Sequence, residues 1–262
     1  EPGLYGVQKF DCSQLKARKY VSMDGNLEGT SLLIAAGAAN ARFTKRFQRE
    51  VLKDAAELAI QVHGLTGAHV QFQERQLANA IKTVVRIVYY IRKEVPCRLI
   101  SLNGGSQTTI PVDCTARIAL ALEHMDKARE VAQRVLEEVK FEHKESDPNM
   151  TLSLSEKAHA SPAMPEDVTD KVVTLLRLLP AGLVDTSLVF PGLPISSFSL
   201  ETIETTDSSI GWFYRPTSAI TSKMLDMDEQ SRLLAQLFDV EYHVENYFYG
   251  HNVEAGTPLY NV

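Results

Sequence analysis

Three side chains stand where the sequence could support chemistry. His69 follows Gly64 and Gly67, and glycines allow the backbone angles that a sharp turn requires. A histidine held in such a turn at the rim of a sheet can donate a hydrogen bond to a ligand. Arg215 ends the run SIGWFYR, and its planar guanidinium suits a carboxylate. Asp24 closes the run KYVSMD, and a carboxylate at the end of a strand is a frequent metal ligand.

These residues must be positioned by elements that the apolar periodicity predicts. Residues 51–157 carry one complete α+β unit, in which the second element, a helix, stops before Pro96. The order strand, helix, strand, strand, helix, strand predicts a ferredoxin-like βαββαβ unit. The predicted strands lie near 58–62, 97–105, 109–124 and 150–156, and the helices near 77–91 and 125–139.

The order of elements repeats in part after a polar, proline-bearing hinge at 158–164. Two such units side by side can extend one antiparallel sheet with the helices on one face, which is the α+β fold that we predict. The second unit is predicted from a helix near 168–179, strands near 196–205 and 209–215, a helix near 228–239 and a strand at 242–250.

The composition predicts a folded protein without affinity for nucleic acid or membranes. With 44% hydrophobic residues among 262, the chain can bury a large core. A formal net charge of -6 gives no basic surface for nucleic acid, and no apolar run approaches the roughly 20 residues that span a bilayer. Cys12, Cys97 and Cys114 form no C-x-x-C pair, so we interpret them as small core residues. We expect a cytoplasmic protein.

The motifs around these residues resemble those of a known enzyme family. The segments GAHVQ at 67–71, LANAIK at 77–82 and NGGSQTTIP at 103–111 are similar to the series G-G-H-S-G, N-A-N-K, N-G-G and N-A-I-P in the lid domain of Xaa-His dipeptidases. These are the aminoacyl-histidine or carnosinase-type members of the dimetal zinc peptidase clan. MDGNLEG at 23–29 likewise resembles the family's D-S-E-E-E-G segment.

The resemblance implies a role for four residues. Asp24 would be a zinc ligand in the parent enzyme. His69 would donate a hydrogen bond to the carbonyl oxygen of the scissile amide as negative charge develops there. Arg215 would bind the C-terminal carboxylate of the substrate, and Asn79 would also contact the substrate.

Several positions depart from the family pattern. Val70 and Gln71 replace the small residues that follow the lid histidine, and Thr108 and Thr109 stand where the family has an asparagine. The segment Ser196–Glu201 replaces T-S-L-N-V-G, so a second substrate-binding asparagine is lost. These departures put recognition of a dipeptide ending in histidine in question.

The resemblance also implies that the chain is a fragment. Residues 1–50 and 251–262 would be short pieces of the catalytic domain, and residues 51–157 and 158–250 the two halves of the lid. Of the ligands that two zinc ions need, only Asp24 is present, so the fragment would bind no zinc and hydrolyse nothing. Its partners would be the dipeptide substrate, the missing catalytic domain and, in a homodimer, a second copy.

A different class of function stays open. The same fold could be a non-catalytic module that binds peptides or amino acids, or one that only mediates oligomerisation, because a fold alone does not choose between them. A His-x-Asp pair and a Glu-Glu pair encoded upstream would favour the enzyme.

Overall fold

The computed structural model describes residues 9–16, 35–70 and 72–250. The chain divides into two compact units, residues 1–33 and 34–262. In the first unit, the described residues include one short 3-10 helix, η1 (Cys12–Gln14). The strand expected at 19–24 with Asp24, and the segment 251–262, lie outside the described residues.

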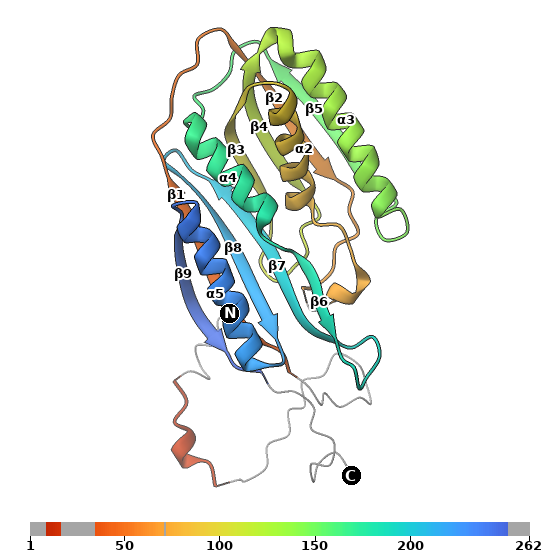
Figure 1. Ribbon diagram of the computed structural model, residues 1–262, viewed down its shortest axis with the longest axis vertical. Coiled ribbons are helices and arrows are strands. Elements are labelled where there is room, and N and C mark those ends of the chain that lie inside the picture. The colour runs from red at the N-terminus through yellow and green to blue at the C-terminus, as the bar shows by residue number, and fades with distance from the viewer. Residues whose placement is uncertain (1–8, 17–34, 71, 251–262) are drawn as a thin grey trace. The chain divides into compact units, whose positions relative to one another are not determined.

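The second unit is built on one antiparallel sheet, with the helices on one face, as predicted (Figure 1). The order along the sheet is β5-β2-β4-β3-β7-β8-β1-β9, and β6 pairs with β7 beside this path. The strands are β1 (Gly37–Arg46), β2 (Ala55–His63), β3 (Cys97–Gly105), β4 (Cys114–Ala121), β5 (Thr151–Lys157), β6 (Gly182–Thr186), β7 (Pro194–Thr205), β8 (Ser209–Ser218) and β9 (Glu241–Phe248).

The helices follow the apolar stripes of the sequence. They are α2 (Ala80–Glu94), α3 (Met125–Glu142), α4 (Glu166–Leu178) and α5 (Thr221–Leu237). The structure differs from the prediction in several details: β6 was not expected, β4 begins only at Cys114, and α5 begins at Thr221 and not near residue 228. The periodicity of α5 is blurred because Leu225 and Leu233 are exposed while Asp228 is buried. No helix among the described residues is long and apolar enough to cross a membrane.

The sheet contains two ferredoxin-like halves that meet edge to edge. β2-α2-β3-β4-α3-β5 forms the first half, as predicted, in the spatial order β5-β2-β4-β3. The second half has the mirrored order β7-β8-β1-β9, so β1 occupies the place that β2 holds in the first. The second half is therefore assembled from residues 37–46, which precede the first half in sequence, together with residues that follow it.

One continuous core holds the helices on the sheet. Alternate strand residues face the helices, and Phe43, Trp212 and Tyr214 are fully buried among them. The rings of Phe43 and Trp212 stack with centroids 5.1 Å apart, which joins β1 to β8 through side chains as well as backbone. Cys97 and Cys114 are buried in the same core, as expected, and burial raises the pKa of the Cys97 thiol to about 12.

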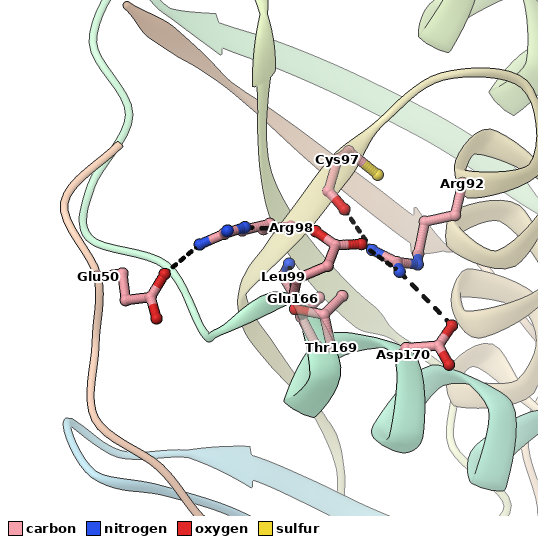
Figure 2. A network of polar contacts seen from close by, with 8 residues as sticks. All are labelled: Glu50, Arg92, Cys97, Arg98, Leu99, Glu166, Thr169 and Asp170. Atoms are coloured by element: carbon pink, nitrogen blue, oxygen red, sulfur yellow. Dashed lines mark hydrogen bonds and ion pairs between the residues drawn. The ribbon is translucent and has the colours of Figure 1, made fainter. Parts of the chain in front are cut away.

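Polar contacts at its first turn attach α4, the first helix of the second half, to the first half (Figure 2). The Glu166 carboxylate accepts hydrogen bonds from Arg92 at 2.8 Å and Arg98 at 3.3 Å. Thr169 accepts a hydrogen bond from the Leu99 backbone N–H at 3.2 Å. Arg98 also pairs with Glu50, so this network connects α2, β3, α4 and the segment after β1.

Candidate functional site

The loop that carries His69 is a tight turn pinned to the β3–β4 connection. Gly64 and Gly67 have φ of +79° and +64°, as their types predicted. His69 pairs with Thr109 as an isolated β-bridge. On either side, the Val70 N–H donates to the Thr108 carbonyl at 3.0 Å, and the Ile110 N–H to the Ala68 carbonyl at 2.8 Å. His69 is thus held by backbone contacts to residues 108–110.

Arg215 lies on the face of β8 that turns away from the helices, because Trp212 and Tyr214, which alternate with it along the strand, are in the core. Its guanidinium stacks over the Phe213 ring, with Cζ 5.3 Å from the centroid. The Arg215 side chain is 17% exposed, and its Nε lies 3.2 Å from Glu201 Oε1. Among the described residues, its Nη groups have no hydrogen bond or ion pair, so they are available to a ligand.

Glu201 connects Arg215 to the His69 loop. Register shifts in the β7–β8 pairing between Leu200 and Thr202, so Glu201 is the extra residue of a β-bulge, a feature that re-aims side chains. The residue is fully buried, and its second oxygen, Oε2, accepts the Thr108 backbone N–H at 2.7 Å. Burial raises the pKa of the Glu201 carboxyl, against the opposing effect of Arg215.

Asn79 is the N-cap of α2. Its Oδ1 accepts the Lys82 N–H at 3.2 Å, which is the usual capping contact. Its Nδ2 donates to the Leu200 carbonyl at 2.8 Å, next to the bulge at Glu201. Both polar atoms of the side chain are therefore engaged within the fold, and contact of Asn79 with substrate stays a prediction.

A cavity of about 180 Å³ lies on the helix side of the sheet, and Asn79 and Ser199 are among its lining residues. Lys82 also lines it, but its Nζ donates to three carbonyls at the end of α4, those of Leu176, Arg177 and Leu179. Burial, followed by the neighbouring charge of Arg177, lowers the pKa of Lys82 to about 8. Because all three N–H groups of its ammonium are donated to these carbonyls, Lys82 caps the C-terminal end of α4.

No group of three or more His, Cys, Asp or Glu residues in the described part of the chain could hold a metal ion. His143 contacts the Gln76 carbonyl at 3.2 Å, and His63 contacts the Ser153 hydroxyl at 2.9 Å, so both have ordinary protein partners. Asp24, the one predicted zinc ligand, lies outside the described residues. The described residues therefore do not fit a zinc centre.

The sequence prediction missed Glu201. The motif comparison marked its segment only as a departure, although a single acidic residue within the apolar and hydroxyl-bearing run Ile195–Ile203 was a visible signal. A charge inside a buried strand is rarely retained without a partner. That partner is Arg215, which the comparison had selected separately.

Comparisons with known proteins agree with this fold. The chain is 27% identical over 213 residues to the cytosol non-specific dipeptidase of Escherichia coli (strain K12), a match that covers 80% of this chain and 44% of the dipeptidase. The crystal structure of aminoacylhistidine dipeptidase from Vibrio alginolyticus matches with a TM-score of 0.90 at 21% identity, over 99% of this chain and 54% of that one. No family model matches the chain.

The predicted resemblance to Xaa-His dipeptidases is thus confirmed: the chain is similar to one dipeptidase in sequence and has the fold of part of another. The chain spans about half the length of each of these two proteins.

Proposed function

We propose that this chain is the lid of a cytoplasmic, zinc-dependent dipeptidase and supplies substrate-binding groups to a catalytic domain formed elsewhere in the protein. The single observation that carries the proposal is the connected set His69 loop, Glu201 and Arg215. Through the buried side chain of Glu201, the set joins the loop of His69, the proposed oxyanion donor, to Arg215, the proposed carboxylate receptor. The names of the two similar proteins supply the class of reaction, hydrolysis of a dipeptide.

In this proposal, each residue acts on a different part of the substrate. Arg215 receives the C-terminal carboxylate through its available Nη groups, because a guanidinium binds carboxylates with two parallel hydrogen bonds. His69 donates a hydrogen bond to the carbonyl oxygen of the scissile amide as that oxygen gains negative charge. The backbone contacts to residues 108–110 limit the movement of the His69 backbone, from which the imidazole donor projects.

The division of the chain follows from the same proposal. Residues 51–250 would form the lid. Residues 1–50 would connect the catalytic domain to the lid, and residues 251–262 would return from the lid to the catalytic domain. β1, within 1–50, completes the second half of the sheet, so this flank contributes to the lid as well. Zinc would polarise the scissile carbonyl and activate water, and its ligands would come from the catalytic domain, with Asp24 the one candidate here. The chain alone is expected to be inactive.

The test is an assay of the full product of the open reading frame for zinc content and for hydrolysis of alanyl-histidine. We expect His69→Ala to lower kcat about 100-fold with little change in KM, the usual loss for an oxyanion donor. We expect Arg215→Ala to raise KM for alanyl-histidine but not for alanyl-histidinamide, which lacks the carboxylate. Arg46→Ala is the matched control, because Arg46 is an exposed arginine on the neighbouring strand β1.

Unchanged kcat in His69→Ala, or equal losses on the acid and the amide in Arg215→Ala, would remove the corresponding role. Binding of the dipeptide without zinc or hydrolysis would favour the other class of function, a peptide-binding module.

A further inference from the structure

Glu201 occupies a place that packing alone does not explain. It is a fully buried carboxylate on the sheet face away from the helices, at the extra residue of a β-bulge. A buried acidic group costs free energy unless its oxygens are partnered, and burial raises the pKa of this one. A serine or glycine at this position would avoid that cost in free energy. The contacts that the carboxylate makes therefore need an explanation in terms of function.

Each of the two carboxylate oxygens of Glu201 contacts a different half of the sheet. Oε1 lies 3.2 Å from Arg215 Nε on β8, in the second half. Oε2 accepts the Thr108 N–H at 2.7 Å from the β3–β4 connection, in the first half. Thr108 in turn accepts the Val70 N–H, directly after His69. One carboxylate thereby spans the distance between the arginine and the histidine loop.

The contact between Glu201 and Arg215 is a buried ion pair at one edge of the guanidinium. Glu201 Oε1 pairs with the Nε edge through charge alone, without hydrogen-bond geometry, and the two Nη groups are left for a second carboxylate. The Phe213 ring lies against the guanidinium from one side, with Arg215 Cζ 5.3 Å from the ring centroid. The ion pair with Glu201 and the Phe213 ring together restrict the Arg215 side chain, which lowers the entropy lost when a ligand binds.

We infer that Glu201 is a positioning residue that holds Arg215 in register with the His69 loop, so that the carboxylate receptor and the oxyanion donor are set at a fixed spacing. The inference rests on the proposed function for the roles of His69 and Arg215. The spacing would select substrates in which the scissile amide and the C-terminal carboxylate are one residue apart.

The first test does not depend on activity. Amide hydrogen exchange is measured at Thr108 and Val70 in the full chain, in Glu201→Gln and in Glu204→Gln. Glu204 is the matched control, an exposed glutamate three residues along the same strand. We expect exchange at both amides to accelerate at least about tenfold in Glu201→Gln only, with β8 amides unchanged. Equal protection in all three proteins overturns the inference, whatever the activity.

The second test uses the full protein and the ratio of kcat/KM for alanyl-histidine to that for alanyl-histidinamide. We expect Glu201→Gln to lower this acid-to-amide ratio about tenfold, and Glu201→Asp to restore part of it. The effect of Glu201→Gln on the ratio should vanish in an Arg215→Ala background, whereas its effect on kcat, which acts through the His69 loop, should persist.

The outcomes separate the two proposals. A higher acid-to-amide ratio in Glu201→Gln overturns the inference, because removal of a competing negative charge alone would give that result. If the wild-type protein does not distinguish the acid from the amide, the proposed function fails at Arg215. The exchange result then still decides whether Glu201 holds the His69 loop.

Discussion

Glu57 shows how a single buried carboxylate can stabilise this sheet. It is 1% exposed, and it accepts hydrogen bonds from Arg117 Nε at 2.6 Å and Nη2 at 2.8 Å. The Ser161 hydroxyl and backbone N–H also donate to it, at 3.1 and 3.3 Å. Burial alone would raise its pKa, but these hydrogen bonds and the charge of Arg117 outweigh burial and lower the pKa from 4.5 to about 2.

We predict that Glu57→Gln lowers the free energy of unfolding by about 3 kcal/mol at pH 7, the equivalent of this change in pKa. Because the folded-state pKa is depressed, the stabilisation is complete above the unfolded pKa of 4.5 and is lost as pH falls towards about 2. Urea unfolding from pH 7 to 3 measures it, and the difference from wild type should shrink to about 1.5 kcal/mol at pH 3.

Glu204→Gln, at an exposed position, should differ little from wild type over the same pH range. A difference between Glu57→Gln and wild type that stays constant down to pH 3 would show that shape, and not charge, accounts for the loss.

Residue types in this chain predicted the candidate site only in part. His69 and Arg215 could be selected because a glycine-rich turn and a strand end are local patterns. Glu201 could not be assigned to Arg215, because the contact depends on a bulge that shifts the β7–β8 register by one residue. The role of Asn79 as an N-cap depended on where α2 begins, and helix boundaries are poorly fixed by periodicity.

At the scale of the element, α5 is attached to the edge strand β9 through Asp228. This buried side chain accepts a hydrogen bond from the Tyr247 hydroxyl at 2.8 Å and another from the Tyr242 hydroxyl. Arg232, one turn along the helix, donates to it at 3.2 Å. Burial and the hydrogen bond to Asp228 raise the pKa of both tyrosines.

We predict that Asp228→Asn loosens β9 more than any other strand, because an amide offers one acceptor oxygen where the carboxylate offers two. Loss of one such hydrogen bond should cost about 1–2 kcal/mol. Amide hydrogen exchange should therefore accelerate about tenfold or more over β9 and stay unchanged over β5, the opposite edge of the sheet.

The matched control for this helix is Asp226→Asn, since Asp226 is exposed and, within the described part of the chain, pairs only with Gln230 on the same helix. Acceleration of equal size in both variants, or over both edge strands, would contradict a specific connection between α5 and β9.

The elements themselves were predictable where the apolar pattern is strong and local. The first half follows the predicted order because each of its strands and helices has a clear period in the sequence. Because the apolar stripe of α5 is weak, the prediction misplaced the start of this helix. The position of β1 in the sheet could not be predicted for a different reason. β1 pairs with β8 and β9, whose residues are more than 160 positions away, and periodicity carries no information about such partners.

At the scale of the whole molecule, the candidate site exists only where the two halves join. His69 and Thr108 belong to the first half, and Glu201 and Arg215 to the second. The junction is narrow, since β3 and β7 pair in register only at Gly104↔Ile203 and Gly105↔Thr202. Arg49 reinforces it by donating to carbonyls on three segments, those of Ile100, Pro162, Thr206 and Asp207.

Gly105 is the residue on which this junction depends most directly. Its φ is +78°, and a Cβ at this position would lie 2.0 Å from the Glu201 carbonyl oxygen. Backbone cannot move away from that contact without separating β3 from β7. We therefore predict that Gly105→Ala lowers the free energy of unfolding by more than about 3 kcal/mol, since a steric clash is added to the cost of a positive φ.

Gly192→Ala isolates the clash, because Gly192 has a similar φ of +83° but nothing within 4 Å of the Cβ position. It should cost only about 1 kcal/mol. Urea unfolding followed by the fluorescence of Trp212, the single tryptophan, measures both variants. Exchange at the Thr108 amide should accelerate in Gly105→Ala alone, because separating the halves also draws Glu201 from the loop. Equal losses of stability in the two variants would mean that β3 and β7 can move apart at little cost in free energy. The spacing between His69 and Arg215 would then be set by other contacts.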